Sequence, residues 1–346
     1  MNTTRMNRRG EYVRSALLGV GAYCLARAAW RAWNWHSFQG EVAFITGGSR
    51  GLGLVLARQL AQEGARLAIC ARNAEELEAA AAELSDSGAT VLSRVCDVGD
   101  EQQLRAFLAT VEQEFGPVDL LINNAGIIQA GPLASMTKDD YEAALKVHFW
   151  GPLRAIDSVL PCMLHRGRGR IVNISSIGGK IAVPHLIPYC ASKFALAGLS
   201  DGLRSELLSK GISVTTVYPG LMRTGSARHA MFKGRHRMEH LWFSLGAAMP
   251  VLSQPAARAA AQILDAARFG QAEIVLSLPA KLAVRLNQLA PEMMSTMKSI
   301  ANRLLPREGG IGTEQRPGYA SQSALSPSLL TAAGDQAARE NNEMFE

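Results

Sequence analysis

The sequence predicts an α/β fold in which a parallel sheet of about seven strands is covered by helices on both faces. From residue 41 onward, short apolar runs alternate with Ala-rich amphipathic stretches, and a glycine-rich turn joins the first run to the first amphipathic stretch. Single strands separated by helices form βαβ units with right-handed crossovers, and such units build a parallel sheet.

Each predicted element rests on its own run of residues. The apolar runs that predict strands are 42–46, 66–70, 90–96, 120–122, 170–174, 213–218 and 273–276. The stretches with helical periodicity are 54–63, 75–85, 101–115, 138–163 and 189–209. Apolar side chains at helical spacing over residues 280–305 predict a further helical extension near the C-terminus.

The composition is that of a globular protein without a nucleic-acid-binding body. Of 346 residues, 48% are hydrophobic and 19% charged, which suffices to bury a full core. The net charge is +6, but residues 1–40 hold six arginines against one acid, so the rest is nearly neutral. The five cysteines are scattered without metal-ligand spacing, so we expect neither a disulfide framework nor a metal site.

Residues 1–39 are predicted to be a basic, apolar leader that associates with a membrane through residues 12–35. The unbroken apolar run 16–26 is shorter than the roughly 20 residues that cross a bilayer. We therefore expect a helix lying at the cytoplasmic face of a membrane, with Trp30, Trp33 and Trp35 at headgroup depth. A single-pass segment, a cleaved signal peptide and a helix packed on the body remain alternatives.

The turn after the first strand has the spacing of a phosphate-binding loop. It reads Thr46-Gly47-Gly48-Ser49-Arg50-Gly51-Leu52-Gly53 and opens the first helix. Its first glycine permits a tight turn, Gly51 lets the backbone approach a diphosphate, and Gly53 lets helix and strand pack closely. The helix N-terminus then receives the anion.

Two further motifs make the pattern specific. Asn123-Asn124-Ala125-Gly126 and Tyr189-Cys190-Ala191-Ser192-Lys193 follow the glycine loop in this order. Over residues 40 to 225 the sequence resembles the classical short-chain dehydrogenase/reductase family. The resemblance implies a Rossmann-like doubly wound sheet and hydride transfer between a nicotinamide cofactor and an alcohol or carbonyl.

The end of the second predicted strand favours NADP(H) as the cofactor. Ala71 stands where NAD-preferring relatives carry an acid, and Arg72 follows it. Together with Arg50, this supplies two guanidinium groups that suit a 2′-phosphate. The alternative is that both arginines are merely solvated.

The resemblance also assigns the remaining cofactor contacts. Asp97 and Val98 should border the adenine, although Asp97 could instead be a turn cap. Asn124, Ala125 and Gly126 should border the adenosine ribose. The segment after the sixth strand should meet the nicotinamide end, through Pro219, Gly220, Met222 and Thr224.

Tyr189, Lys193 and Ser176 are the predicted catalytic residues. The tyrosine and lysine are four residues apart, so on a helix their side chains are neighbours. An adjacent ammonium favours the phenolate, and the phenol can exchange the proton that accompanies hydride transfer. By resemblance, Lys193 also holds the nicotinamide ribose, and Ser176, thirteen residues before Tyr189, hydrogen-bonds the substrate oxygen.

His148 departs from the family pattern. It occupies the place of an asparagine of the proton relay, in the run His148-Phe149-Trp150-Gly151. An imidazole could still bind a water and pass protons. A buried packing histidine is the other interpretation.

The domain boundaries follow from these assignments. Residues 40–227 form the dinucleotide-binding catalytic core, and residues 228–306 a lid, the last strand and the helical extension of the same domain. The tail 307–346 lacks periodicity and is predicted to be disordered.

The interleaved apolar and cationic residues of the lid suggest a lipophilic carbonyl or alcohol as substrate. The alternative is a catalytically weak, NADP(H)-binding scaffold or sensor at the membrane. Family members are often dimers or tetramers, and the C-terminal extension leaves the oligomeric state open.

Overall fold

The computed structural model describes residues 35–249, 253–323 and 332–344, together with five single residues between 21 and 33. The chain divides into two units, residues 1–37 and residues 38–346. The expected interfacial helix at 12–35 lies almost entirely outside the described residues. In the described part of the chain, no helix combines the length and apolar character that crossing a membrane requires.

The second unit is built on a parallel sheet of seven strands in the order β11-β7-β6-β4-β1-β2-β3. This confirms the predicted α/β fold and its Rossmann-like sheet. Its strands are β1 Val42–Thr46, β2 Arg66–Ala71, β3 Val91–Val95, β4 Leu120–Asn123, β6 Gly169–Ile174, β7 Ile212–Tyr218 and β11 Glu273–Val275.

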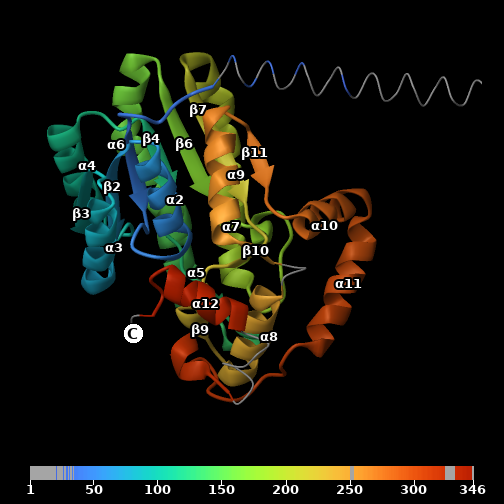
Figure 1. Cartoon of the computed structure of the whole chain (residues 1–346). Coiled ribbons are helices and arrows are strands. Elements are labelled where there is room, and N and C mark those ends of the chain that lie inside the picture. The colour runs from blue at the N-terminus through green and yellow to red at the C-terminus, as the bar shows by residue number, and fades with distance from the viewer. Residues whose placement is uncertain are drawn as a thin grey trace, which may run out of the picture. The chain divides into compact units, whose positions relative to one another are not determined.

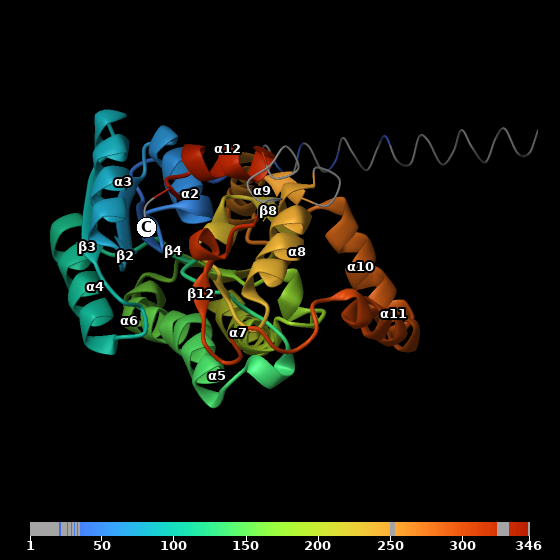
Figure 2. The same cartoon turned by 90° about the horizontal axis from the view of Figure 1, so that it is seen from below.

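Helices cover both faces of the sheet, as Figures 1 and 2 show from two directions. On one face lie α2 Gly51–Gln62, α3 Ala74–Asp86 and α9 Ala256–Arg268; on the other lie α4 Glu101–Phe115, α6 Gly151–Arg166 and α7 Ile187–Leu207. Strand β1 divides the two cores, because Ala43 and Ile45 point into the first and Val42 and Phe44 into the second. Such two-sided burial explains why β1 is continuously apolar.

The topology reverses direction beside β1, and this positions the site. From β1 the chain runs outward through β2 and β3, and then returns to β4 on the other side of β1. Ligands of open α/β sheets bind at such a switch point, outside the carboxyl ends of the strands. The glycine loop and the Asn124 motif follow β1 and β4 at this place.

The predicted helix 138–163 is interrupted. It consists of α5 Lys138–Leu145, a π-helical segment Lys146–Trp150, and α6. The apolar periodicity runs through all three parts, so sequence alone gave no sign of the break. A π-helical turn within an α-helix is rare and occurs most often at functional sites.

The region after Thr224 contains more regular structure than predicted. Helix α8 (His236–Ala248) lies in the predicted lid, and α9 packs against α2 in the core. Two small sheets pair β8 Leu221–Arg223 with β10 Ser253–Pro255, and β9 Met231–Phe232 with β5 Gln129–Ala130 and β12 Arg316–Pro317. The predicted C-terminal extension is the helix pair α10 Leu278–Leu289 and α11 Pro291–Leu304.

The prediction of a disordered tail is wrong for residues 307–323 and 332–344. Strand β12 pairs with β9, and α12 (Ala332–Glu340) buries Ala337 and Ala338. A nine-residue helix is marginal alone in water, so its order comes from packing against α8 and β8. Composition carries no trace of such contacts.

Candidate active site

The glycine loop has the geometry that its sequence predicts. Gly47 has φ +67°, and a side chain on Gly53 would overlap the Gly47 carbonyl oxygen. The Gly47 and Gly48 amides both donate to the Cys70 carbonyl, at 2.8 and 3.1 Å. Helix α2 begins at Gly51, so its N-terminal amides point toward the end of the sheet.

A cavity of about 950 Å³ begins at this loop and extends to the C-terminal ends of β6 and β7. All predicted catalytic residues except His148, and all predicted cofactor residues except Gly53, line this cavity. Gly53 lies behind the loop, where the absence of a side chain lets α2 pack against the Gly47 carbonyl. The cavity and the glycines of the loop, which let a ligand approach the backbone, together fit an extended dinucleotide.

Two residues that are predicted to contact the adenosine also have structural roles. Asp97 Oδ1 accepts a hydrogen bond from the Gly99 amide at 2.9 Å, so Asp97 both lines the cavity and caps a turn. Asn124 Nδ2 donates to the carbonyls of Thr46 and Gly47 at 3.1 and 3.0 Å. The Asn124 side chain therefore holds the glycine loop in place, and the residue also lines the cavity.

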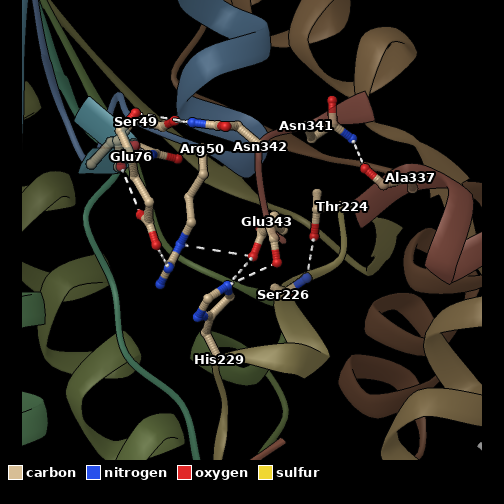
Figure 3. Close-up of polar contacts among 12 residues, drawn as sticks. Ser49, Arg50, Glu76, Thr224, Ser226, His229, Ala337, Asn341, Asn342 and Glu343 are labelled. Carbon is tan, nitrogen blue, oxygen red and sulfur yellow. Dashed lines mark hydrogen bonds and ion pairs between the residues drawn. The ribbon is translucent and has the colours of Figure 1, made fainter. Parts of the chain in front are cut away.

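Arg50 is not free in solvent, because Glu76 of α3 binds it. Arg50 Nη1 and Glu76 Oε1 are 2.6 Å apart, and Ser49 Oγ donates to Glu76 Oε2 at 3.3 Å (Figure 3). Sequence reasoning missed Glu76, although its place in the first turn after β2 was available as a signal. Arg72 lines the same end of the cavity.

At the other end, α7 carries Tyr189 and Lys193 into the cavity. Lys193 Nζ donates to the Ile174 carbonyl at 2.8 Å and lies 5.8 Å from the centre of the Tyr189 ring. Ser176 follows β6; its Oγ accepts from the Gly178 amide at 3.0 Å and contacts the Tyr189 hydroxyl. Ser175 donates to the Lys193 carbonyl at 2.9 Å, which ties α7 to the end of β6.

Burial dominates the electrostatics of this cluster. It raises the pKa of Tyr189 to about 12, opposed by the hydrogen bond with Ser176. Burial likewise lowers the pKa of Lys193 to about 7. Desolvation, and not a neighbouring ammonium, therefore sets the direction in which the tyrosine pKa moves, contrary to the expectation from sequence.

His148 lies in the π-helical segment with both ring nitrogens bound to protein. Its Nε2 accepts from the Ile127 amide at 3.1 Å, and its Nδ1 is 2.7 Å from Ser192 Oγ. Because Ser192 Oγ itself donates to the Tyr189 carbonyl, Nδ1 carries the proton. Burial, followed by the charge of Lys193, lowers the pKa of His148 well below its usual value. This arrangement favours the packing interpretation over the relay.

The segment that is expected to meet the nicotinamide follows β7. The Ile177 amide donates to the Pro219 carbonyl at 2.7 Å, which joins this segment to the turn that carries Ser176. Thr224 Oγ1 accepts from the Ser226 amide at 3.3 Å. Gly220, Met222 and Thr224 line the cavity here.

Behind the cavity, α8 contributes a buried acid that the sequence reading missed. Glu239 accepts from Trp242 Nε1 at 2.6 Å and lies 2.8 Å from His185 Nδ1. His185 itself has φ +64°, an uncommon conformation for a residue with a side chain. The network fixes Trp242, which lines the cavity, and no local pattern in the sequence signals it.

The sequence profile of the short chain dehydrogenase family matches residues 41–232. The chain belongs to the short-chain dehydrogenase/reductase family. This short-chain dehydrogenase is 41% identical to a putative ketoacyl reductase of Streptomyces coelicolor over 54% of its own length and 72% of the relative's.

Solved structures of the family have the same fold. A gluconate 5-dehydrogenase from Burkholderia cenocepacia, in complex with NADP and tartrate, is 30% identical with a TM-score of 0.62, over 70% of this chain and 96% of the other. A short-chain dehydrogenase/reductase from Burkholderia phymatum, in complex with NAD, is 25% identical with a TM-score of 0.69, over 75% and 96%. Two further neighbours are complexes with NADP or NADPH.

Replacing His148 by Asn, the usual residue of the family at this place, should preserve or raise turnover. We expect a loss of stability of about 1–3 kcal/mol, because a buried partner loses its hydrogen bond. Turnover and urea unfolding of His148→Asn measure the two effects separately. A hundredfold fall in turnover with intact folding would show that the imidazole itself moves protons.

The buried Lys193 should make stability depend on pH. In the unfolded chain its pKa returns to about 10.4, whereas in the folded protein it is about 7. Between these values the unfolded chain binds more protons, so the free energy of unfolding rises with pH. Relative to Lys193→Met, the wild-type protein should gain stability from pH 7 toward pH 10 and show a constant difference below pH 7. Urea unfolding of both proteins from pH 6 to pH 10 measures this difference in the free energy of unfolding. A difference that stays constant over the whole range would contradict the proposed burial of a charged amine.

Proposed function

We propose that this chain is an NADP(H)-dependent oxidoreductase that transfers a hydride between the nicotinamide and a lipophilic carbonyl or alcohol. The proposal rests on one observation: Ser176, Tyr189 and Lys193 meet in a cavity that is continuous with the glycine loop. Bound NADPH supplies the hydride that reduces the carbonyl carbon.

The chain's own residues supply the proton and hold the substrate. With a pKa raised to about 12, Tyr189 is protonated at neutral pH and gives its phenolic proton to the carbonyl oxygen. Ser176, in contact with that hydroxyl, donates a hydrogen bond to the same oxygen. Lys193 holds the nicotinamide ribose, and in the oxidative direction the phenol takes the proton back.

NADP(H) is preferred because of the residues after β2. The strand ends at Ala71, and Arg72 at the cavity wall binds the 2′-phosphate. Arg50 reaches the same end of the cavity, although Glu76 neutralises part of its charge. The neighbours that hold NADP or NADPH support this choice. Because one neighbour holds NAD, the preference rests mainly on Ala71, Arg72 and Arg50 of this chain.

A lipophilic substrate is supported by the cavity walls beyond Tyr189. These walls are largely apolar and come from the turn before α7, from α8 and from α10; they include Val183, Leu186, Trp242, Phe243, Pro279 and Ala283. On the outer side of α10, Leu278 and Leu282 are 68% and 61% exposed. An apolar surface beside the cavity lets a poorly soluble molecule enter without crossing water.

The proposed enzyme works at the cytoplasmic face of a membrane, to which residues 12–35 attach it; a single-pass attachment is the alternative. The exposed apolar side chains of α10 and α11 alternate with Lys281, Arg285 and Lys298, a composition suited to an anionic surface. Exposed Met293, Met297 and Ile300 extend the apolar face along α11.

Arg72→Gln tests the cofactor choice. Loss of a charge-assisted hydrogen bond of about 1.5–3 kcal/mol should raise the Kd for NADPH about 10- to 100-fold and leave the Kd for NADH within twofold. Fluorescence titration of both cofactors measures this. The control is Arg94→Gln on β3, whose side chain bonds the Ala106 carbonyl at 3.3 Å outside the cavity. Tighter binding of NADH by the wild-type protein would contradict the proposal.

Tyr189→Phe tests the reaction. NADPH consumption should fall about 10²–10⁴-fold when the proton donor is removed, while the Kd for NADPH stays within twofold. Tyr141→Phe on α5, outside the cavity, serves as control. The substrates are long-chain aldehydes and steroid ketones beside small polar carbonyls, with and without liposomes. Full activity of Tyr189→Phe would refute the mechanism, and turnover of the small polar carbonyls alone would refute the lipophilic substrate.

A further inference from the structure

The end of the chain is bound to the glycine loop. After α12, residues 341–343, which we call the strap, run past the N-terminus of α2 (Figures 2 and 3). The Gly51 amide donates to the Asn341 carbonyl at 2.9 Å. Gly51 is the first residue of α2, where free amides bind anions. The strap therefore takes a donor at the place where a diphosphate binds.

Asn342 fastens the strap on its other side. Its Nδ2 donates to the carbonyls of Ser49 and Glu76, both at 2.9 Å. The residue has φ +60°, which turns the chain back toward the loop. Arg58 of α2 adds a hydrogen bond to the Glu340 carbonyl at 3.0 Å. These contacts define one position of the strap on the loop.

Glu343 places a buried carboxylate on the open side of Gly51. A Cβ built on Gly51 would lie 2.6 Å from Glu343 Oε1. Oε2 is buried without a hydrogen-bond partner among the described residues, and it lies 3.5 Å from His229 Nε2 and 3.7 Å from Arg50 Nε (Figure 3). The carboxylate thus lines the cavity with its bonding capacity unfilled.

The charged groups around Glu343 balance it only in part. Burial raises the pKa of Glu343 to about 8; Arg50 and Arg228 oppose this rise, and Glu76 adds to it. Burial, with Arg50, lowers the pKa of His229 to about 4, so the imidazole is neutral at physiological pH. Arg50 is itself paired more closely with Glu76. Above pH 8, where Glu343 is ionised, an additional anion brought to this place meets a carboxylate that shares the positive charge of Arg50 with Glu76.

We propose that the strap is a built-in competitor for the diphosphate of the dinucleotide, so that cofactor binding requires residues 341–343 to leave Gly51. This inference rests on the proposed use of a dinucleotide. The direction of the bonds favours competition over a clasp that closes on bound cofactor. Toward the cavity the strap presents the Asn341 carbonyl, which accepts from Gly51 and cannot bind phosphate oxygens. Above its pKa of about 8, the Glu343 side chain is likewise only an acceptor. Its two side-chain amides, Asn341 and Asn342, already donate to backbone carbonyls.

The full-length protein and two variants test the proposal. At pH 9, above the pKa of Glu343, Glu343→Gln removes the charge at constant size, and a chain ending at Glu340 removes the strap but leaves α12. Glu340→Gln is the matched control, because it removes an exposed carboxylate one turn away. Kd values are measured by titration with NADPH and with adenosine, which lacks every phosphate. Thermal unfolding shows that each variant is folded.

We expect Glu343→Gln and the truncated chain to bind NADPH at least fivefold more tightly than the wild type. Their Kd for adenosine, and the Kd of Glu340→Gln for NADPH, should stay within twofold of the wild-type values. Hydrogen exchange of residues 332–344 should become faster in the wild-type protein saturated with NADPH. Unchanged or weaker NADPH binding by both variants, or slower exchange with NADPH, would overturn the strap alone. Failure of every variant to bind NADPH or NADH would overturn the proposed function together with the strap.

Discussion

The attachment of α7 to the end of β6 is the constraint on which the rest of the site depends. Lys193 donates to the Ile174 carbonyl, and Ser175 donates to the Lys193 carbonyl, so helix and strand are joined in both directions. This joint fixes Tyr189 beside Ser176. It also buries an amine, which costs free energy whenever the amine is charged. This cost of burial is also what lowers the pKa of Lys193.

The same trade between burial and charge appears at the other end of the cavity. Arg50, Glu76, His229 and Glu343 lie together around the N-terminus of α2, with two acids, one arginine and a neutral imidazole. A helix N-terminus and an arginine would otherwise hold any anion. The chain fills this place with its own carboxyl group. The affinity for a dinucleotide therefore depends on how much more tightly the site binds the diphosphate than it binds Glu343. The catalytic end has no such occupant among the described residues, which makes the two ends of the cavity functionally distinct.

The sequence predicted the elements and residues whose signals are local. The strands, the glycine loop and the Tyr189–Lys193 pair each lie within a few residues, where periodicity and spacing record the geometry. Glu343 lies 292 positions beyond Gly51, and its place depends on α12 packing on α8, so no local pattern could reveal it. The partners of His148 were hidden for the same reason: Ser192 is 44 residues away, and the π-helical turn leaves the apolar periodicity intact.

Tracing the hydride from NADPH to the substrate tests most directly whether this protein is an oxidoreductase. NADPH with deuterium at both C4 positions of the nicotinamide is incubated with the full-length protein and a long-chain or steroid ketone, and the product is examined by mass spectrometry and NMR. The account predicts one deuterium per product molecule, on the former carbonyl carbon of a single stereoisomer, together with oxidised cofactor. Cofactor that is bound but never oxidised in the presence of such ketones would contradict it.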